Sequence, residues 1–263
     1  MSGLLSIIIP AYNEDKRIGR SLEEILRFVS GQDYRSEVIV VDDGSSDETG
    51  QIVTSFIDRY AASGHTLKVL TNTPNRGKGY SVRRGVAAAS GDVILFTDAD
   101  LSSPITEAPN LIEPIVEGRA DVTFGSRALN RKLIGVRQSL VRDFGGRVFN
   151  LFMRTITGLK YKDTQCGFKA FRREGALPVF LAQRIERFGF DPEVLYIARK
   201  RGLRLLEVPV VWNHSEDSKV SYFRDSIKMF TDLIYIRVND FAGRYNNTPT
   251  DLTSEAESAT KQP

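Results

Sequence analysis

The sequence predicts a single α/β domain built on a mostly parallel β-sheet with helices on both faces. Short apolar runs rich in Val and Ile alternate with longer amphipathic stretches through the first half of the chain. Near-continuous apolar strands separated by helices are typical of parallel sheets that are buried on both faces. The 263 residues, 41% of them hydrophobic, are enough for one full core, and no linker divides them.

The expected elements alternate along the chain. The predicted strands are Leu4–Ile9, Val38–Val41, Leu67–Leu70, Val93–Phe96, Val122–Phe124 and Leu205–Val211. The predicted helices are Lys16–Val29, Ser46–Ala62, Gly79–Ala89, Pro104–Glu117, Gln138–Thr157, Pro192–Arg201 and Tyr222–Val238. Ser45 and Glu48 have the spacing of a capping box, and Pro104 suits a first helical position. We expect one domain over residues 1–245 and a disordered polar tail over 246–263.

Composition excludes several classes of protein. A single cysteine, Cys166, excludes a disulfide framework and a cysteine-based zinc site. No stretch reaches the roughly 18 apolar residues of a membrane-spanning helix. The first residues predict a strand rather than a signal peptide, so we expect a cytoplasmic protein.

Basic residues concentrate in one segment. Residues 127–162 contain nine Lys or Arg and one acid, Asp143, so this segment carries +8 although the whole chain carries only +3. The rest of the chain is therefore net acidic. The basic segment is expected to face an anion, and nothing in the sequence indicates a nucleic acid.

The usual nucleotide motifs of α/β proteins are absent from the sequence. The turn after the first predicted strand is Pro10-Ala11-Tyr12-Asn13-Glu14, which has no glycine for a pyrophosphate. Gly77-Lys78-Gly79 lacks the third glycine of a dinucleotide fingerprint, and there is no Walker-type run. Dehydrogenases and P-loop NTPases are therefore poor candidates.

Acidic residues follow two of the predicted strands. Asp42-Asp43-Gly44 follows the second strand, and Asp98-Ala99-Asp100 follows the fourth. Carboxylates two residues apart at a strand end can share one hard cation such as Mg²⁺ or Mn²⁺ with the phosphates of a substrate. Taken alone, Asp98 is equally consistent with a turn or cap residue, and Asp-Gly is ordinary turn chemistry.

In combination, the motifs resemble the inverting GT-A glycosyltransferases of family 2, whose sheet is Rossmann-like. The motifs that carry the resemblance are Pro10–Glu14, Asp42–Ser45, Asn75–Gly79, Asp98–Asp100, Gly125–Arg127, Asp163–Lys169, Phe190–Ala198, Glu207–Trp212 and Ser218-Lys219. Asp163–Lys169 is the most specific of them. Within the family the chain looks closest to dolichyl-phosphate β-glucosyltransferases, with dolichyl-phosphate mannose synthases next. Ser102 and Asn213 replace a Gln and an Arg that are usual in the mannose synthases, which favours the glucosyl group.

The resemblance implies a nucleotide-sugar donor site, with UDP-glucose as the expected donor. The nucleoside would be held by Pro10, Tyr12, Glu14, Asp42 and Asp43. The diphosphate would be contacted by Arg76, Lys78 and Lys219, the last from a loop expected at Asn213–Val220. Asp98 and Asp100, with Ala99 between them, would bind Mg²⁺ or Mn²⁺, which stabilises charge on the departing nucleotide.

The acceptor decides whether a general base is needed. A sugar hydroxyl needs a carboxylate to take its proton, and Asp191 and Glu193 lie where the family keeps its base. A polyprenyl or dolichyl phosphate is already ionised and instead needs cations, for which Arg127, Arg137 and Arg142 are candidates. Asp191 also suits an N-cap before Pro192, and we expect it both to cap the helix and to face the sugar.

The residues expected to act in catalysis are Asp98, Asp100, Asp191 and Arg127. Transfer to a lipid phosphate is the preferred function. A GDP-mannose donor, a saccharide hydroxyl acceptor and a non-catalytic nucleotide-sugar-binding protein remain the alternatives.

Two predicted helices suggest contact with a membrane surface. Gln138–Thr157 places large apolar residues beside three arginines, and Tyr222–Val238 collects apolar residues on one face. This combination is typical of interfacial helices, although packing in the core explains the second helix equally well. The sequence thus predicts a protein peripherally associated with the inner face of the membrane.

Overall fold

The computed structural model describes residues 3–130, 150–213 and 222–246. Its centre is a seven-stranded sheet in the order β3-β2-β1-β4-β6-β5-β7. The strands are β1 Leu5–Ala11, β2 Ser36–Asp42, β3 Thr66–Thr71, β4 Val93–Phe96, β5 Val122–Ser126, β6 Lys169–Arg172 and β7 Leu205–Pro209. Neighbouring strands are parallel, except that β6 is antiparallel to both β4 and β5. The predicted mostly parallel α/β sheet is confirmed.

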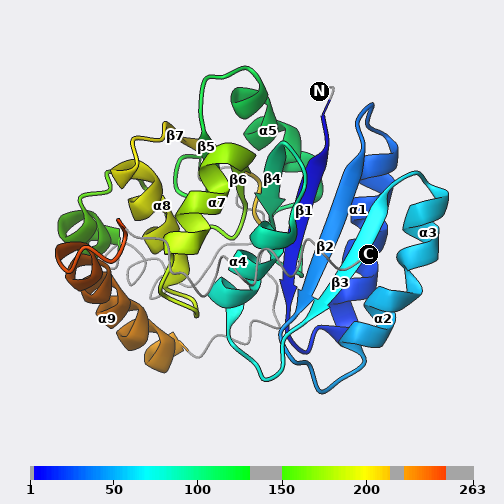
Figure 1. Ribbon diagram of the computed structural model, residues 1–263, viewed down its shortest axis with the longest axis horizontal. Coiled ribbons are helices and arrows are strands. Elements are labelled where there is room, and N and C mark those ends of the chain that lie inside the picture. Colours follow the sequence, from blue (N-terminus) through cyan, green and yellow to red (C-terminus); the bar gives the residue numbers. More distant parts are fainter. Residues whose placement is uncertain (1–2, 131–149, 214–221, 247–263) are drawn as a thin grey trace.

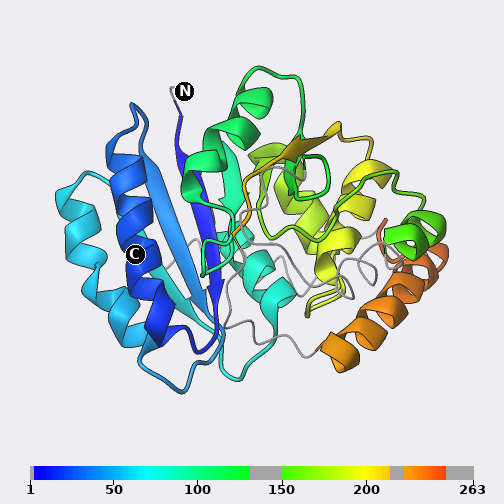
Figure 2. The same cartoon turned by 180° about the vertical axis from the view of Figure 1, so that it is seen from behind.

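Helices cover both faces of this sheet, as Figures 1 and 2 show from opposite sides. The helices are α1 Asp15–Ser30, α2 Thr49–Ser55, α3 Ile57–Ala62, α4 Lys78–Ala88, the 3₁₀ turn η1 Ile105–Glu107, α5 Ala108–Val116, α7 Arg173–Ala182, α8 Phe190–Lys200 and α9 Tyr222–Phe241. Residues 150–157 are also helical. Helices α1 and α5 lie on one face, and α4, α7 and α8 lie on the other.

The core consists of two apolar layers separated by the sheet. Ile7 and Ile9 of β1 belong to the layer under α1 and α5, whereas Ile8 belongs to the layer under α4, α7 and α8. Successive side chains of a strand point to opposite faces, so a strand buried on both sides must be apolar throughout. The run Ile7-Ile8-Ile9 therefore predicts this interior strand correctly.

The sequence did not predict β6 and α7. β6 is only four residues long, Lys-Ala-Phe-Arg, and it carries a charge at each end. α7 contains Gly175 and Pro178, which weaken the helical pattern. In the sheet β6 nevertheless occupies an interior position between β4 and β5. Long-range pairing, rather than local propensity, places this strand.

The predicted helix Ser46–Ala62 is two helices. At Phe56 the backbone N–H bonds to the carbonyl of Val53, three residues back, at 3.1 Å. This tighter bond ends α2, and α3 begins at Ile57. The single-helix prediction was wrong because periodicity does not reveal one tightened turn.

The predicted capping box at Ser45 and Glu48 was also wrong. α2 begins at Thr49, and the backbone N–H of Thr49 donates a hydrogen bond of 3.0 Å to the Asp47 carboxylate. Ser45 instead accepts the N–H of Asn13 through its hydroxyl at 2.9 Å. Pro104 is the N-cap before the first helical residue, Ile105, so its prediction as a first helical residue was wrong by one position.

None of the helices in the described chain combines the length and apolarity that a membrane span requires.

Candidate functional site

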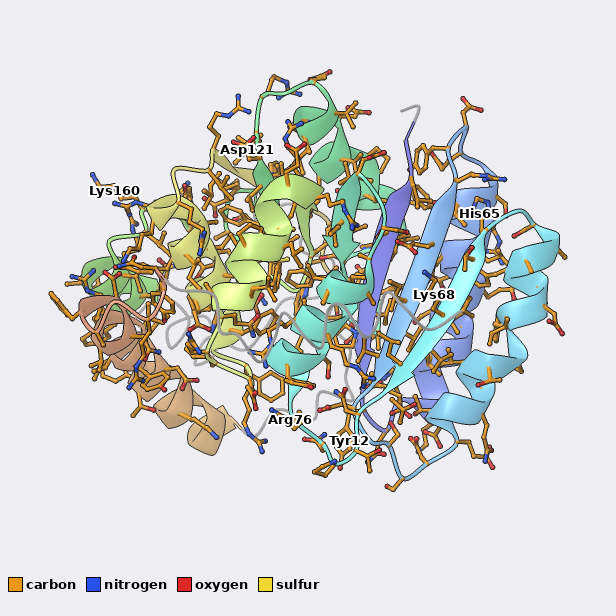
Figure 3. The ribbon with its side chains drawn as sticks, in the orientation of Figure 1. Tyr12, His65, Lys68, Arg76, Asp121 and Lys160 are labelled. Atoms are coloured by element: carbon orange, nitrogen blue, oxygen red, sulfur yellow. The ribbon has the colours of Figure 1, made fainter. Side chains whose placement is uncertain are left out.

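The predicted site residues gather at the carboxyl ends of β1, β2 and β4. Because these strands are parallel and adjacent, their carboxyl ends meet at one edge of the sheet. Figure 3 shows Tyr12 and Arg76 together at this edge, whereas Asp121 lies at the opposite edge. Ligands of open α/β sheets bind outside the carboxyl ends of the strands. The predicted residues therefore come together where a ligand site is expected in this kind of sheet.

The loop after β1 is fastened to the loop after β2. Asn13 has a positive φ of 54°, and its N–H bonds to Ser45. The N–H of Glu14 bonds to the hydroxyl of Thr49 at 2.7 Å, and its carboxylate pairs with Arg17 at 2.6 Å. Tyr12 lies between these anchors with 44% of its surface exposed. A half-exposed aromatic ring on a fixed loop can stack against a flat ligand such as a base.

Asp43 organises the loop that precedes α4. Its carboxylate accepts the side-chain N–H of Asn72 at 2.7 Å and the backbone N–H groups of Arg76 and Gly77 at 3.0 and 2.7 Å. Asp42 is also buried, and it accepts the N–H of Ser45 at 2.9 Å. Both carboxylates thus shape the loops of the site in this structure. Contact of either with a nucleoside stays a prediction.

Gly77 allows the loop to turn close to its neighbours. Its φ is +109°, and a Cβ at this position would lie 2.5 Å from the Glu186 carbonyl oxygen. Arg76 stacks over the ring of Tyr80 at 4.1 Å and pairs with Glu186 at 2.9 Å. A side chain at position 77 would therefore push the loop away from the 183–189 segment.

Lys78 is directed at the predicted metal ligands. Its ammonium group lies 2.5 Å from Asp98 Oδ1 and 5.9 Å from the centre of the Phe190 ring. Burial acts to lower the pKa of Lys78, but the charges of Asp98 and Asp191 outweigh it, so the pKa is raised. Lys78, the first residue of α4, is therefore charged at neutral pH, and its ammonium group reaches Asp98 beyond the end of β4.

The Asp98–Asp100 turn is crowded on one side. A Cβ on Gly167 would lie 2.2 Å from Asp98 Oδ2, so a glycine is required for this approach. Asp100 Oδ1 accepts the N–H of Ser102 at 2.9 Å, and the Ser102 carbonyl accepts the N–H of Asn213 at 2.8 Å. The two carboxylates suit a hard divalent cation whose other ligands come from a substrate. Within the described residues no group of three or more His, Cys, Asp or Glu could hold a metal alone.

Arg127 forms a clamp with Asp163. Its Nε and Nη2 atoms donate to the two carboxylate oxygens at 2.6 and 2.9 Å, and its backbone N–H donates at 3.1 Å. The guanidinium also lies 5.6 Å from the Trp212 ring centre. Burial acts to raise the pKa of Asp163, but the paired Arg127 reverses the shift and lowers it. The clamp ties the end of β5 to the segment before β6.

Asp191 does not cap a helix. α8 begins at Phe190 with Gly189 as its N-cap, so Asp191 is the second helical residue and the predicted N-cap was wrong. Its buried carboxylate instead pairs with Lys169 of β6. Burial raises the pKa of Asp191, and the neighbouring lysines oppose this effect.

Glu193 lies two residues after Asp191 in α8 and is also buried. Its carboxylate accepts the N–H groups of Arg184 and Ile185 and the hydroxyl of Tyr245, at 3.1, 2.8 and 2.8 Å. Burial raises the pKa of Glu193 to about 7. The side chain is fully buried and braces three segments, so it is poorly placed to serve as a base for a substrate.

Other predicted residues cannot be placed. Arg137, Arg142 and Lys219 lie outside the described residues, as do most of the loop expected at Asn213–Val220 and most of the helix expected at Gln138–Thr157.

Sequence reasoning assigned no role to Lys169, Asp163, Gly167 or Glu186. The signal for Lys169 was present, because one charge stands among the apolar residues of the run Gly-Phe-Lys-Ala-Phe. Cys166 is buried.

A comparison with models of protein families shows which family the chain belongs to. The model described as glycosyl transferase family 2 matches residues 6–177. The chain belongs to this family. It is a glycosyltransferase, and its fold is the GT-A fold that the sequence predicts.

Curated relatives cover most of the chain. The dolichyl-phosphate β-glucosyltransferase of Dictyostelium discoideum is 34% identical over 91% of this chain and 75% of its own length. The Homo sapiens enzyme of the same name is 32% identical over 92% of this chain and 77% of its own length.

Solved structures share the fold. Glucosyl-3-phosphoglycerate synthase from Mycobacterium tuberculosis, crystallised with Mn²⁺, UDP-glucose and phosphoglyceric acid, has a TM-score of 0.64 at 20% identity. The likeness covers 94% of this chain and 81% of the synthase chain.

Proposed function

We propose that this glycosyltransferase moves glucose from UDP-glucose to dolichyl phosphate or a related polyprenyl phosphate, with inversion at the anomeric carbon. The observation that carries the proposal is the similarity to a relative named dolichyl-phosphate β-glucosyltransferase, which is 34% identical over 91% of this chain. The arrangement of Asp98, Lys78 and Asp191 at one edge of the sheet supports it.

The donor would bind across the ends of β1, β2 and β4. Tyr12 would stack on the uracil, with Pro10, Glu14, Asp42 and Asp43 framing the nucleoside. Arg76, Lys78 and Lys219 would contact the diphosphate, whose charge matches their cationic groups. Lys78 is already held at the end of β4, where the diphosphate would reach Asp98.

Asp98 and Asp100 would hold Mg²⁺ or Mn²⁺ together with the diphosphate, and Ala99 spaces the two carboxylates. Mn²⁺ in the glucosyl-3-phosphoglycerate synthase crystals supports a divalent ion in this fold. When bound, such an ion stabilises the negative charge that develops on the departing UDP.

The acceptor phosphate would attack the anomeric carbon from the side opposite UDP. A new C1–O bond forms to the phosphate while the C1–O bond to UDP breaks, and the bonding electrons leave with UDP. The acceptor arrives ionised, so no proton has to be removed. The Lys169–Asp191 pair is compatible with this choice, since the Asp191 carboxylate is already hydrogen-bonded to a buried ammonium and an ionised acceptor needs no free base. Arg137 and Arg142, with Arg127 near the end of β5, would neutralise the acceptor phosphate.

The lipid acceptor requires a membrane surface, and exposed apolar residues support one. They are Leu151 and Phe152 on the 150–157 helix, and Ile234, Tyr235, Val238 and Phe241 on α9. The two helices touch through the rings of Phe152 and Phe230, whose centres are 5.0 Å apart. The enzyme would bind peripherally at the inner, cytoplasmic face of the membrane.

A product assay tests the proposal. Purified protein is incubated with UDP-glucose or GDP-mannose and Mg²⁺ or Mn²⁺, with and without dolichyl phosphate in detergent micelles. We expect β-glucosyl phosphodolichol from UDP-glucose only. Mannosyl lipid would reassign the donor, transfer to an added saccharide alone would reassign the acceptor, and nucleotide-sugar binding without turnover would indicate a non-catalytic protein.

A further inference from the structure

Lys169 is a fully buried lysine next to the site. Its side chain has no exposed surface, and its ammonium group pairs with Asp191 and donates to the Cys166 carbonyl at 2.5 Å. It also lies 5.2 Å from the centre of the Phe96 ring. Fully buried lysines are rare, and those that occur are paired. The question is therefore what the buried Lys169–Asp191 pair does in this protein.

The sheet places Lys169 between two strands that end at site residues. In the antiparallel pairing, Lys169 lies opposite Phe96 of β4 on one side and opposite Phe124 of β5 on the other. β4 leads directly to Asp98, and β5 leads to Arg127. Main-chain pairing on both sides of β6 thus fixes Lys169, and its side chain extends from a rigid backbone.

Asp191, the partner of Lys169, lies on a different element and is held by this rigid lysine. Asp191 lies in the first turn of α8, and Gly189 and Phe190 precede it. Lys169 and Lys78 both interact favourably with Asp191, and Lys78 also pairs with Asp98. The four charges alternate in sign from β6 to the end of β4. Phe96 and Phe190, with ring centres 5.8 Å apart, lie beneath the two ammonium groups.

Stability alone does not account for this pair. Removing two charges from water costs several kcal/mol per ion, and apolar replacement of a buried ion pair is often neutral or stabilising. A hydrophobic pair between β6 and α8 would hold the core at least as well. The charges therefore serve the position of the Asp191 carboxylate.

We propose that Lys169 is the positioning residue for Asp191, fixing its carboxylate to accept hydrogen bonds from the hydroxyl groups of the transferred sugar. The inference rests on the proposed transfer of glucose. Lys169 acts only through Asp191 and touches neither donor nor acceptor. Misplacing a positioned group by about 1 Å can cost about 100-fold in rate.

A double-mutant cycle tests the inference. Lys169→Met and Asp191→Asn are made singly and together, and kcat for glucosyl transfer is measured alongside UDP affinity by calorimetry. Each single change should lower kcat by about 100-fold and leave UDP affinity unchanged. The double variant should be no slower than Asp191→Asn, because Lys169 has nothing left to position. Lys68→Met is the matched control, since Lys68 pairs with buried Glu37 at 3.0 Å, away from Tyr12 and Arg76 (Figure 3).

Three results would overturn the inference. The first is a wild-type kcat in folded Lys169→Met. The second is a further loss of kcat when Lys169→Met is added to Asp191→Asn, equal to the loss that Lys169→Met causes alone. The third is a loss of UDP affinity as large as the loss of kcat. If Lys169→Met does not fold, the double variant, which has no charge at either position, is compared with Asp191→Asn. A much lower kcat in the double variant contradicts the inference. If the wild type hydrolyses a sugar nucleotide but makes no glucosyl lipid, the proposed function fails, and the same cycle on that hydrolysis still decides the role of Lys169.

Discussion

At the scale of single residues, the candidate site combines partly exposed carboxylates with buried carboxylates that hold loops. Asp98 and Asp100 lie at the end of β4, and the Asp98 side chain is 36% exposed. Asp43 and Asp163 are buried, and their oxygens accept hydrogen bonds from neighbouring segments. Sequence spacing does not separate the two kinds of carboxylate, whereas tertiary contacts do.

Asp100→Ala should abolish transfer at any Mg²⁺ or Mn²⁺ concentration while the protein stays folded. The change removes one of two paired carboxylates and one hydrogen bond to Ser102, so the cost falls on the metal rather than the core. Steady-state transfer and a thermal melt check this expectation. Asp58→Ala, at an exposed position in α3, is the control. Near-wild-type turnover in Asp100→Ala would remove the metal-site assignment.

Glu193 makes stability depend on pH. Its pKa is raised from about 4.5 to about 7 in the folded protein, so its protonated form favours folding. This contribution is fully present below about pH 4.5 and is lost as the pH rises through 7. Glu193→Gln lacks this titration. From pH 5 to pH 8 we expect the wild type to lose about 2–3 kcal/mol of unfolding free energy that the variant keeps.

Urea unfolding of both proteins at pH 5 and pH 8 measures that difference, and the fixed cost of the substitution cancels between the two pH values. Glu117→Gln, at an exposed position, controls for the general loss of a carboxylate. A constant difference between Glu193→Gln and the wild type would refute the assignment.

At the scale of elements, the parallel strands were predictable, whereas the antiparallel strand was not. Each of β1, β2 and β4 is apolar on both faces, and this pattern is visible in the sequence. β6 has only four residues, and its Lys169 pairs with Phe96, 73 positions earlier in the chain, and with Phe124, 45 positions earlier. 

No local signal specifies pairing at such distances, so β6, and with it the placement of Lys169, had to come from the structure.

The predicted roles at element ends were less accurate than the elements themselves. Asp191 was expected to cap α8, but it lies inside the first turn and pairs with Lys169. Ser45 was expected to cap α2, but it joins the loops after β1 and β2. In both cases a polar side chain found a partner far away in the sequence, which local capping rules do not consider.

Gly167→Ala should weaken metal binding without unfolding the protein. The new Cβ would lie 2.2 Å from Asp98 Oδ2, so the carboxylate has to move. Loss of support behind a metal ligand typically costs 10–100-fold in affinity, and we expect a change of about that size. Mn²⁺ affinity in the presence of UDP, measured by electron paramagnetic resonance, checks this. Gly19→Ala, whose Cβ would meet Ile52 at 3.4 Å, is the control, and equal Mn²⁺ affinity in both variants would contradict the prediction.

At the scale of the whole molecule, the site and the exposed apolar residues lie on different parts of the surface. The 150–157 helix and α9 lie together at the side of the molecule away from β3, and one end of α9 points toward the edge where the strands end (Figure 1). Leu151 is 65% exposed and Phe241 is 82% exposed. A lipid acceptor lying in a membrane under these helices could present its phosphate to the site.

Vesicle binding tests this arrangement, since both apolar insertion and basic charge would contribute. The protein should sediment with vesicles that contain anionic lipid and detach as salt rises, because salt screens the attraction between exposed cations and headgroups. Leu151→Ser and Phe241→Ser together should reduce binding at constant salt, because each removes an exposed apolar side chain. Val116→Ser in α5, which is 49% exposed, is the matched control and should bind as the wild type does. An absence of vesicle binding at low ionic strength, or equal binding by the double variant and the control, would count against an interfacial role for these helices.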